Sequence, residues 1–362
     1  MKIVADENIS LLDEFFSAQG DIVRLPGRKI SAADLRDADV LLVRSVTKVN
    51  EALLANSRVR FVGSCTIGTD HLDTHWLDNH NIAWAHAPGC NAEAVVDYVI
   101  ACLFALDVDL KKIAEGEFVI GVVGCGNVGS RLVKRLQKLG ATVLCCDPFK
   151  RSAHYIPLEE LLPHCDMVCL HTPLTHGGKY PTRHLIHQDN LPLFKNNAVL
   201  LNAGRGAVVD NTALLAHLET HPDFRVVLDV WEYEPDILRT LLQCAYIATP
   251  HIAGYSIEGK RRGTEMIYAA FCKYFHIKHQ ATVDPEEKLE FDATHFATLR
   301  DLVLACCDPL KDSEELKHAP QSFDQLRKLY IYRREFSQCR IRKVPENKRA
   351  LLRALGFNRN RT

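Results

Sequence analysis

Short runs of Val, Ile and Leu recur along the chain, and longer segments with a different apolar spacing lie between them. Nearly continuous apolar runs are typical of strands that are buried on both faces of a parallel sheet. In the longer segments apolar residues return every three or four positions, as Leu132, Leu136 and Leu139 do, which is the spacing of helices that cover a sheet. The repeated alternation of the two patterns predicts an α/β protein built on parallel sheets.

The apolar runs predict nine strands. They are Lys2–Ala5, Val40–Val43, Phe61–Gly63, Phe118–Val123, Thr142–Cys146, Met167–Leu170, Ala198–Asn202, Val226–Val230 and Tyr246–Ala248. The helical spacing is clearest in three segments. They are Ala94–Leu110, Ser130–Leu139 and Lys260–Phe275.

Changes in composition divide the chain into three predicted parts. Residues 1–95 form a first α/β domain, which is completed by about 255–280, and residues 96–254 form a second one. Beyond residue 281 charged and aromatic residues replace the apolar runs, so 281–362 is predicted to be a small α+β domain. We therefore expect two doubly wound parallel-sheet domains with a cleft between them, followed by a small C-terminal domain.

The composition is that of an ordinary globular protein, with 362 residues, 47% of them hydrophobic and 25% charged, and a net charge of -1. This balance excludes an overall basic coat for nucleic acid. The 13 cysteines form no C-x-x-C pair and lie mostly in apolar runs, which predicts buried thiols in a reducing compartment. No signal peptide and no membrane-spanning run is recognisable, so we expect a cytoplasmic protein.

A glycine-rich turn joins a buried strand to an amphipathic helix. The predicted strand Phe118–Val123 leads into Gly124–Gly129 (GCGNVG), a helix follows, and the next strand ends at Asp147. In a G-x-G-x-x-G turn the glycines allow a tight turn, close approach of a pyrophosphate, and close packing of helix on strand. The helix N-terminus attracts the phosphates. Asp147 is placed to accept hydrogen bonds from ribose hydroxyls and would repel a 2′-phosphate, which predicts a Rossmann-type site for NAD rather than NADP.

Three later strands lead into loops that carry charged or titratable residues, namely Arg205, then Glu232 with Glu234, and then His251. Ligands of open α/β sheets bind beyond the carboxyl ends of the strands, so we expect these loops to converge. Oxidation of a 2-hydroxy acid needs a cation for the carboxylate, a base for the hydroxyl proton and a hydride acceptor. Arg205 offers a planar cation, His251 can move a proton near neutral pH, and Glu234 can orient the imidazole of His251.

Each of these residues also has an ordinary structural explanation. A loop arginine is usually a surface charge, and any one of 17 histidines is more often structural than catalytic. Glu232 and Glu234 could be a solvated acidic pair. The joint pattern after a dinucleotide fingerprint favours catalysis. No metal site is predicted.

The strings GVVGCGNVGSRL, CDP, HTPLT, NAGRGAVVDNTAL, VVLDVWEYEP and ATPHIAGYS closely resemble motifs of the D-isomer-specific 2-hydroxyacid dehydrogenases. The resemblance is strong over roughly residues 1–275. It implies an NAD-dependent oxidoreductase with a flavodoxin-like substrate-binding domain, a Rossmann domain and a C-terminal domain that forms a homodimer. The catalytic residues that it implies are Arg205, Glu234 and His251. The cofactor contacts that it implies are Gly124, Gly126, Asn127, Val128, Gly129, Asp147, Thr172, Ala203, Gly204, Arg205, Asp229 and Gly254.

Other strings narrow the resemblance. DENI, LLVRSVTKVN, VGSCTIGTDHLD and RRGT are most similar to those family members that oxidise 4-phospho-D-erythronate to (R)-3-hydroxy-2-oxo-4-phosphooxybutanoate, in the biosynthesis of pyridoxal 5′-phosphate (vitamin B6). This resemblance implies substrate contacts at Ser45, Thr66 and Tyr255. Ser45 and Thr66 follow predicted strands, where hydroxyl groups also commonly cap helices, so the residues alone leave their role open. Arg44 could meet a phosphate charge.

Two other functions remain open on the residues alone. One is a different dehydrogenase of the same family, acting on phosphoglycerate, glyoxylate or hydroxypyruvate, or an aliphatic 2-oxo acid. The other is an NAD-sensing binding protein, because relatives of this fold act as transcriptional corepressors and can keep Arg205, Glu234 and His251.

The C-terminal segment is strongly basic, since residues 321–362 hold 12 Lys or Arg against 3 Asp or Glu. It could be a solvated surface, a nucleic-acid contact, or a dimerisation element. We favour dimerisation through Leu326, Leu329, Tyr330 and Phe336, as the resemblance implies, and regard nucleic acid as the weakest explanation. We also expect some arginines of this segment, with Arg342 as the example, to attract a phosphorylated substrate.

Overall fold

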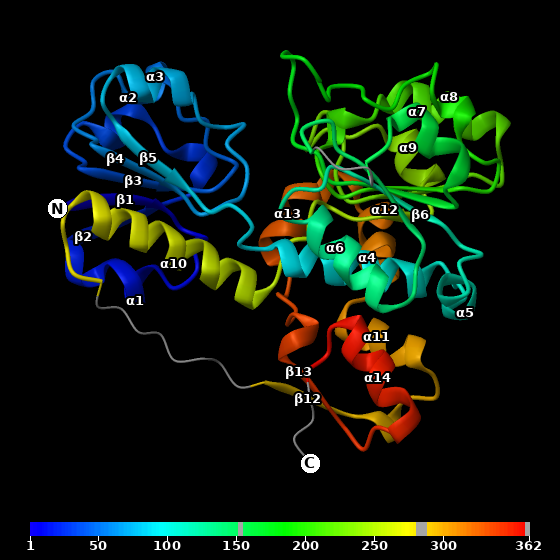
Figure 1. Ribbon diagram of the computed structural model, residues 1–362. Coiled ribbons are helices and arrows are strands. Elements are labelled where there is room, and N and C mark those ends of the chain that lie inside the picture. The colour runs from blue at the N-terminus through cyan, green and yellow to red at the C-terminus, as the bar shows by residue number, and fades with distance from the viewer. Residues whose placement is uncertain (151–154, 280–287, 359–362) are drawn as a thin grey trace. The chain divides into compact units, whose positions relative to one another are not determined.

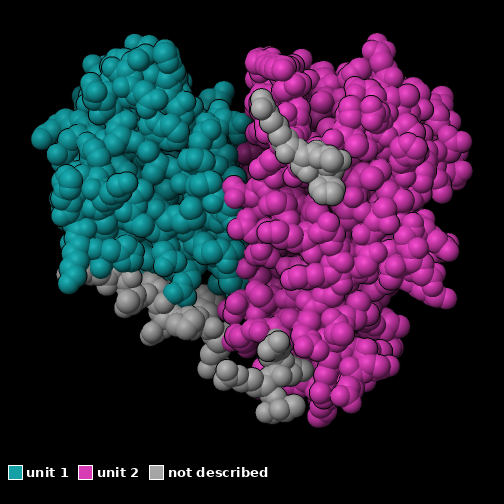
Figure 2. Space-filling view, in the orientation of Figure 1, with its two compact units in different colours: residues 1–91, 256–287 teal, residues 92–255, 288–362 magenta. Residues whose placement is uncertain are grey.

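The computed structural model describes residues 1–150, 155–279 and 288–358. The chain divides into two compact units, coloured teal and magenta in Figure 2. Unit 1 consists of residues 1–91 and 256–287, and unit 2 of residues 92–255 and 288–362. All nine predicted strands are present, and their ends lie within two residues of the predicted ends.

Unit 1 is a sheet of five parallel strands in the order β2-β1-β3-β4-β5. The strands are β1 (Lys2–Asp6), β2 (Asp21–Leu25), β3 (Val40–Val43), β4 (Phe61–Ser64) and β5 (Ala83–His86). This is the flavodoxin-like order, in which the direction of winding reverses between β1 and β3. The carboxyl ends of β3 and β4 lie side by side, because Val43 pairs with Ser64.

Helices cover both faces of this sheet (Figure 1). Ile3, Leu42 and Phe61 pack on one face against α1 (Leu12–Phe16) and α10 (Ile257–Tyr274). Val4, Leu41 and Val62 are buried on the other face with residues of α2 (Glu51–Leu54) and α3 (Thr74–Asn79). The predicted helix Lys260–Phe275 is therefore confirmed as α10, and its return to the first sheet explains why unit 1 is discontinuous in sequence.

The two strands of unit 1 that the apolar pattern did not predict are the edge strands β2 and β5. The residues of β2 are exposed or half-buried, and all four residues of β5 are half-buried. An edge strand is covered less completely than a central one, so its sequence lacks a continuous apolar run.

Unit 2 contains a second parallel sheet in the order β7-β6-β8-β9-β10-β11. The strands are β6 (Ile120–Val123), β7 (Val143–Cys146), β8 (Met167–Leu170), β9 (Val199–Asn202), β10 (Arg225–Leu228) and β11 (Ile247–Ala248). A parallel β-bridge between Cys145 and Tyr155 adds one more strand position to the sheet, on the outer side of β7. With it, the strand order is that of the Rossmann fold, and the winding reverses between β6 and β8.

The second sheet is also covered on both faces. One face packs on α4 (Ala92–Ala105) and α6 (Gly129–Lys138), and the other on α7 (Leu158–Leu161), α8 (Asn211–Thr220) and α9 (Arg239–Cys244). The predicted helix Ala94–Leu110 is shorter than expected, because Asp107 is left-handed with a φ of 54° and ends it. A separate short helix, α5 (Leu110–Ala114), follows.

The C-terminal segment 288–358 packs within unit 2. It comprises β12 (Leu289–Asp292), α11 (Leu299–Cys306), α12 (Pro309–His318), α13 (Phe323–Leu329), β13 (Cys339–Arg342) and α14 (Glu346–Leu355). We predicted a separate third domain from residue 281, whereas these elements share cores with the Rossmann part. Val303 and Phe336 join the core under α4, and Leu316 and Phe323 join the core on the opposite face of the sheet.

The basic residues at the end of this segment have acidic partners in β12. Arg340 and Arg342 lie 3.2 and 3.3 Å from Glu290, and Lys343 lies 2.7 Å from Asp292. The charge of Arg342, which we had expected to attract substrate, is thus partly balanced within the small β12–β13 sheet. Exposed pairs of this kind contribute little to stability.

All 13 cysteines are free thiols, and 11 of them are buried. None of the described helices is long and apolar enough to cross a membrane. The prediction of buried thiols from the apolar context of the cysteines is confirmed.

Candidate active site

The three glycines of the G-x-G-x-x-G turn lie between β6 and α6, and each has a different structural reason. Gly124 has a φ of 85°, which side chains rarely adopt. A Cβ on Gly129 would lie 2.0 Å from the carbonyl oxygen of Gly124, so only glycine allows this approach of helix to strand. A Cβ on Gly126 would have no described atom within 4 Å, so the backbone there faces open space. These are the properties that a pyrophosphate cradle requires.

Several of the predicted cofactor contacts lie around this turn. Asp147 follows β7, and its Oδ2 accepts a hydrogen bond of 2.9 Å from the Cys125 N–H. The exposed Asn127 and the half-buried Val128 lie at the N-terminus of α6. Thr172 follows β8 beside Gly124, and its buried Oγ1 has no hydrogen-bond partner among the described residues. The residues at this end of β6, β7 and β8 therefore suit a dinucleotide.

His171 is half-buried beside the same turn, and its two ring nitrogens are buried without a partner among the described residues. Burial lowers the pKa of His171 to about 4, from 6.5. Between these values the unfolded chain binds a proton that the folded protein does not, so stability falls as the pH falls. From pH 7 to pH 4.5 we expect this histidine to cost the wild type roughly 2–3 kcal/mol of unfolding free energy.

This expectation is checked by urea unfolding at both pH values. Replacing His171 with Asn should remove most of that loss, whereas replacing the exposed His164 with Asn should leave it in place. An equal pH dependence in wild type and His171→Asn would show that His171 is protonated in the folded protein.

Arg205 lies in a turn that begins where β9 ends. Asn202 fixes this turn, because its Oδ1 accepts from the Gly204 N–H at 3.1 Å and its Nδ2 donates to the Arg205 carbonyl at 2.9 Å. Ala203 contacts the core under α4. A Cβ on Gly206 would lie 1.9 Å from the Trp231 carbonyl oxygen, so the loop of Arg205 and the loop after β10 are in direct backbone contact.

His251 and Glu234 form a hydrogen-bonded pair. Nδ1 of His251 lies 2.8 Å from Oε2 of Glu234, and Oε1 of Glu234 accepts from the Trp231 N–H at 2.9 Å. Burial by itself would raise the pKa of Glu234, but His251, Arg327 and the Trp231 N–H outweigh it and hold that pKa below its usual range. Glu234 is therefore a carboxylate that fixes the orientation of the His251 ring through Nδ1. The other ring nitrogen of His251, Nε2, does not contact Glu234.

Asp229, at the end of β10, organises the loop that contains His251. Its Oδ1 accepts from the Thr249 hydroxyl at 2.7 Å and from the N–H groups of Ile252 and Ala253 at 2.7 and 3.0 Å. Its carbonyl oxygen accepts from the His251 N–H at 2.7 Å. His251 has a φ of 57°, a conformation that these bonds stabilise. Gly254 lies in the same loop.

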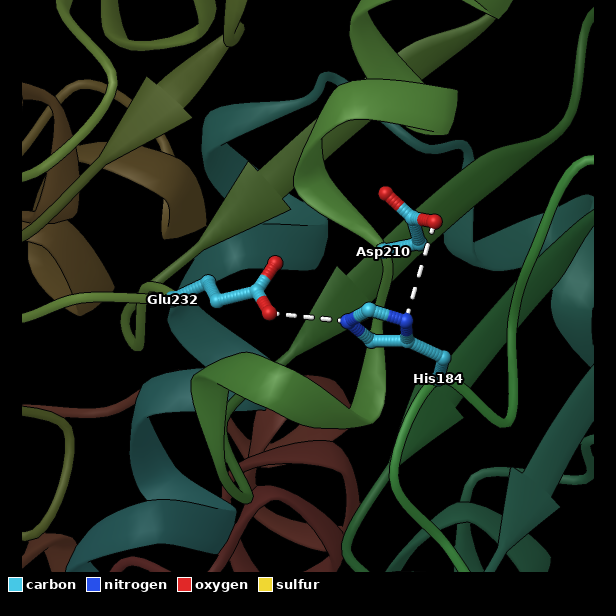
Figure 3. Close-up of side chains that lie close together, drawn as sticks. All are labelled: His184, Asp210 and Glu232. Atoms are coloured by element: carbon cyan, nitrogen blue, oxygen red, sulfur yellow. Dashed lines mark hydrogen bonds and ion pairs between the residues drawn. The ribbon is translucent and has the colours of Figure 1, made fainter.

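Glu232 and Glu234 belong to one turn, but Glu232 has different partners. Its carboxylate lies 2.8 Å from Nε2 of His184, and Nδ1 of His184 lies 3.7 Å from Asp210 (Figure 3). Glu232 is only 5% exposed, so the explanation that it belongs to a solvated acidic pair is wrong. The side chains of this group come from three separate segments of unit 2.

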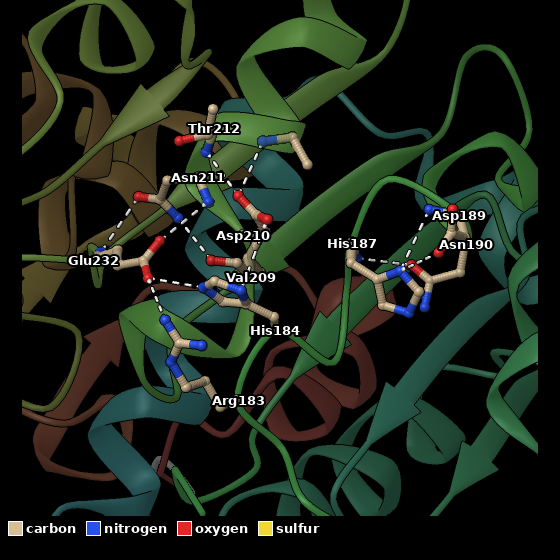
Figure 4. Close-up of polar contacts among 11 residues, drawn as sticks. Arg183, His184, His187, Asp189, Asn190, Val209, Asp210, Asn211, Thr212 and Glu232 are labelled. Atoms are coloured by element: carbon tan, nitrogen blue, oxygen red, sulfur yellow. Dashed lines mark hydrogen bonds and ion pairs between the residues drawn. The ribbon is translucent and has the colours of Figure 1, made fainter. Parts of the chain in front are cut away.

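Figure 4 shows the wider network around Glu232. The backbone N–H of Asn211 donates to Glu232 Oε2 at 3.3 Å, and Asn211 Oδ1 accepts from the Glu232 N–H at 3.2 Å. Arg183 lies 3.9 Å from the same carboxylate. Glu232 therefore anchors the turn of Glu234 to the start of α8 and to residues 183–184, and this anchor was not predictable from local sequence.

The ligand atoms of His184, Asp210 and Glu232 lie within 4.8 Å of one another, a spacing that a metal ion could use. The negative charge of Glu232 is already stabilised by its hydrogen bonds with His184 and Asn211 and by the nearby Arg183. We therefore assign the group a structural role and propose no metal there.

Two of the predicted substrate contacts lie in unit 1. Ser45 is exposed in the turn after β3, and Thr66 follows β4, where its hydroxyl lies 2.8 Å from that of Ser64. The helices that come next along the chain, α2 and α3, are capped by Asn50 and Asp73. The alternative that Ser45 and Thr66 cap helices is therefore wrong.

Arg44, next to Ser45, has a local partner. Its Nε donates to Oδ2 of the fully buried Asp6 at 3.1 Å. The same carboxylate accepts through Oδ1 from the Asn8 N–H at 2.9 Å. The DENI string at the start of the chain is thus joined to the loop after β3 by the contact between Asp6 and Arg44.

Tyr255, the third predicted substrate contact, lies in unit 2 at the end of the His251 loop. Its ring meets those of Tyr330 and Tyr332 from the C-terminal segment, with centroids 6.0 and 5.9 Å away. Arg333 donates to the Tyr255 carbonyl at 2.9 Å. Sequence reasoning missed these contacts, because nothing in a basic tail indicates which of its arginines are buried.

Comparison with known proteins agrees with this arrangement. A family model described as the NAD-binding domain of D-isomer specific 2-hydroxyacid dehydrogenases matches residues 111–253, and one described only as a domain of unknown function matches residues 284–356. An erythronate-4-phosphate dehydrogenase of Pseudomonas putida (strain F1) is 48% identical, over 94% of this chain and 95% of that protein. One of Saccharophagus degradans is 46% identical over 99% of each.

The chain belongs to the erythronate-4-phosphate dehydrogenase family. Its fold also matches solved structures of more distant proteins. A D-lactate dehydrogenase of Aquifex aeolicus, solved with NAD and lactic acid, aligns with a TM-score of 0.64 at 23% identity, over 79% of this chain and 100% of that one. An NAD-bound 3-phosphoglycerate dehydrogenase of Entamoeba histolytica gives 0.63 at 21%, over 79% and 99%. Like the rest of the erythronate-4-phosphate dehydrogenase family, the chain is an NAD-dependent oxidoreductase with parallel-sheet architecture.

Proposed function

We propose that this protein oxidises 4-phospho-D-erythronate at C2 with NAD, giving (R)-3-hydroxy-2-oxo-4-phosphooxybutanoate for pyridoxal 5′-phosphate biosynthesis. The observation that carries the chemistry is the 2.8 Å hydrogen bond between His251 and Glu234, in a loop cluster that also includes Arg205. The choice of substrate is supported by relatives of nearly full length that are named erythronate-4-phosphate dehydrogenases.

Three side chains divide the chemistry in this proposal. Arg205 binds the substrate carboxylate through its planar guanidinium. His251 accepts the proton of the C2 hydroxyl at Nε2, while the Glu234 carboxylate holds Nδ1 and stabilises the imidazolium that forms. NAD, when bound, supplies the acceptor for the hydride that leaves C2. The substrate thus loses one hydride and one proton, which balances its oxidation to a 2-oxo acid.

The residues that we propose to hold NAD come from the ends of β6 to β11. In this proposal the glycine-rich turn would hold the pyrophosphate, Asp147 the adenosine ribose, and Asp229 the nicotinamide end. The carboxylate of Asp147 disfavours a 2′-phosphate, which supports NAD over NADP. The full proposed set is Gly124, Gly126, Asn127, Val128, Gly129, Asp147, Thr172, Ala203, Gly204, Arg205, Asp229 and Gly254.

Ser45, Thr66 and Tyr255 are proposed to contact the substrate. We further propose a homodimer formed through the C-terminal segment, with the apolar Leu329 as one contact, because its side chain is 66% exposed. The expectation that Phe336 also contributes to this interface is wrong, because its side chain is fully buried in the core under α4. A cytoplasmic location is supported by the 13 free thiols, which suit a reducing compartment.

The first test is NADH formation by the purified protein with 4-phosphoerythronate and NAD. We expect reduction with this substrate and little or none with 3-phosphoglycerate or lactate. A parallel reaction should include a 2-oxo acid, because reduced cofactor that stays bound would block turnover.

The possible results separate the alternatives. Activity on another hydroxy acid, with none on 4-phosphoerythronate, would keep the dehydrogenase chemistry and reject the pathway. Cofactor binding without turnover of any hydroxy acid, together with NADH-dependent binding of peptide partners, would support a corepressor-like binding protein instead.

A further inference from the structure

The backbone of the loop that carries His251 is bonded to two charged side chains of opposite sign. Oδ1 of Asp229 accepts from the N–H groups of Ile252 and Ala253 at 2.7 and 3.0 Å. Arg333, from the C-terminal segment, donates to carbonyl oxygens of the same loop. The N–H groups of this loop thus have an anionic partner, and its carbonyl groups have a cationic one.

The guanidinium of Arg333 bonds four backbone carbonyl oxygens. Nη1 donates to those of Tyr255 and Ile252 at 2.9 and 3.4 Å. Nη2 donates to those of Ala253 and Ala94 at 2.6 and 2.8 Å, and the latter lies in the first turn of α4. An arginine suits this task, because its planar fork holds several N–H donors in fixed directions and cannot deprotonate in a protein. Arg333 therefore joins the loop to the start of α4.

The conformation and the burial of the loop explain why it needs such partners. His251 has a φ of 57°, which a residue with a side chain keeps only where its surroundings fix it. The next two residues, Ile252 and Ala253, are each 1% exposed. Buried backbone groups require hydrogen-bond partners, so loss of the Arg333 donors should leave the loop free to rearrange.

The chain around Arg333 is itself attached to α4. Three residues further on, the N–H of Phe336 donates to Oδ2 of Asp97 at 2.8 Å. Asp97 lies in α4, is 1% exposed, and accepts through Oδ1 from Arg135 of α6 at 3.0 Å. The C-terminal segment is thus fixed to α4 at Asp97, and this attachment holds Arg333 close to the carbonyls that it bonds.

We propose that Arg333 is a positioning residue for His251, which holds the carbonyl groups of the His251 loop while Asp229 holds the N–H groups. The C-terminal segment then contributes to the chemistry within a single chain, in addition to its proposed role in the homodimer. The inference rests on the proposed role of His251 as the base. Arg333 acts through the backbone of the loop, and we assign it no contact with substrate or NAD.

The first test is hydrogen exchange followed by mass spectrometry, with Arg333→Met compared with the wild type. Methionine keeps most of the length of the side chain but has no N–H donor. Amide hydrogens in 251–256 should exchange about tenfold faster or more, because the loop loses the charged donors of its carbonyl groups. The glycine-rich turn, 124–129, should exchange as in the wild type. This readout needs no substrate and no turnover.

The second test is kinetic, with a hydroxy acid that the wild type oxidises. In Arg333→Met kcat should fall by about 10- to 100-fold, because a small displacement of a catalytic group costs this much. The KM for NAD should change much less, since the glycine-rich turn and Asp147 remain in place. Arg333→Lys keeps the charge without the planar fork, so it should lie between Arg333→Met and the wild type in both tests.

Arg340→Met is the matched control, because Arg340 lies in the same segment but is exposed and pairs with Glu290. It should match the wild type in both tests. If Arg333→Met does not fold, Arg333→Lys is measured in its place, with a smaller loss expected.

Wild-type kcat in the folded Arg333 variant would overturn the proposal. Faster exchange throughout unit 2, with no additional effect at 251–256, would also overturn it, because Arg333 would then only stabilise the fold. Failure of the proposed function gives a different result. In that case His251→Ala would keep its turnover, while exchange at 251–256 would still report whether Arg333 holds the loop.

Discussion

Replacement of His251 with alanine is expected to lower kcat by about 10²–10⁴-fold while the protein still binds NAD. The imidazole is the one group in the Glu234 pair that can accept the hydroxyl proton near neutral pH. Its removal takes away the base, and the ionised Glu234 is too weak a base to replace it. The residues proposed to hold NAD lie largely in other loops, so cofactor binding should survive.

The measurement is steady-state oxidation at several pH values, together with an NADH fluorescence titration. The exposed His164, replaced with alanine, is the matched control and should keep wild-type activity. Near-normal turnover in His251→Ala would overturn the assignment of this residue as the base. Loss of NADH binding along with turnover would show that His251 acts mainly in building the site.

Substitution of Gly206 with alanine is expected to lower kcat by about 10²-fold or more and to destabilise the fold by about 1–3 kcal/mol. The added Cβ would lie 1.9 Å from the carbonyl oxygen of Trp231 and 2.5 Å from the backbone nitrogen of Glu232. Both neighbours are backbone atoms, and Glu232 is anchored by His184 and Asn211, so the turn of Glu234 has little freedom to yield. The methyl group should therefore push Arg205 and Glu234 apart.

Gly177→Ala is the matched control, because a Cβ there would meet no described atom within 4 Å and its φ is not left-handed. Kinetics and thermal unfolding of both variants check the prediction. If Gly206→Ala folds and keeps wild-type kcat, the close contact between the two loops is not what aligns the catalytic residues. If Gly206→Ala does not fold, its first effect is on stability. A folded Gly177→Ala would then show that the position of the added methyl group, and not the exchange of glycine for alanine, causes the loss.

The apolar pattern predicted every central strand of the two parallel sheets, but it missed β2 and β5, the edge strands of the first sheet. Phe61–Ser64 is buried at every position, so it appears in the sequence as an apolar run. Asp21–Leu25 lies at the edge of the same sheet and has two charged residues among its five. A run of apolar residues reports burial on both faces, which β2 does not have.

The candidate site likewise has features that local sequence predicts and features that it does not. The glycine-rich turn and the strand-end positions of Arg205, Glu234 and His251 follow from local sequence, because a parallel sheet brings the ends of its strands together. The burial of Glu232 does not follow, since its partner His184 is 48 residues away. Arg333 bonds Ala94 across 239 residues, and no local pattern marks it or Arg327 as different from the solvated arginines of the tail.

The sequence by itself determined the fold class, the dinucleotide turn and the order of the loops that carry the catalytic pair, because each depends on short-range periodicity or on a local glycine requirement. Only the tertiary structure decided which polar residues are buried and what they contact, and that the C-terminal segment packs against the His251 loop. The reason is physical: a charged side chain can be buried only if its partners surround it, and those partners come from distant parts of the chain.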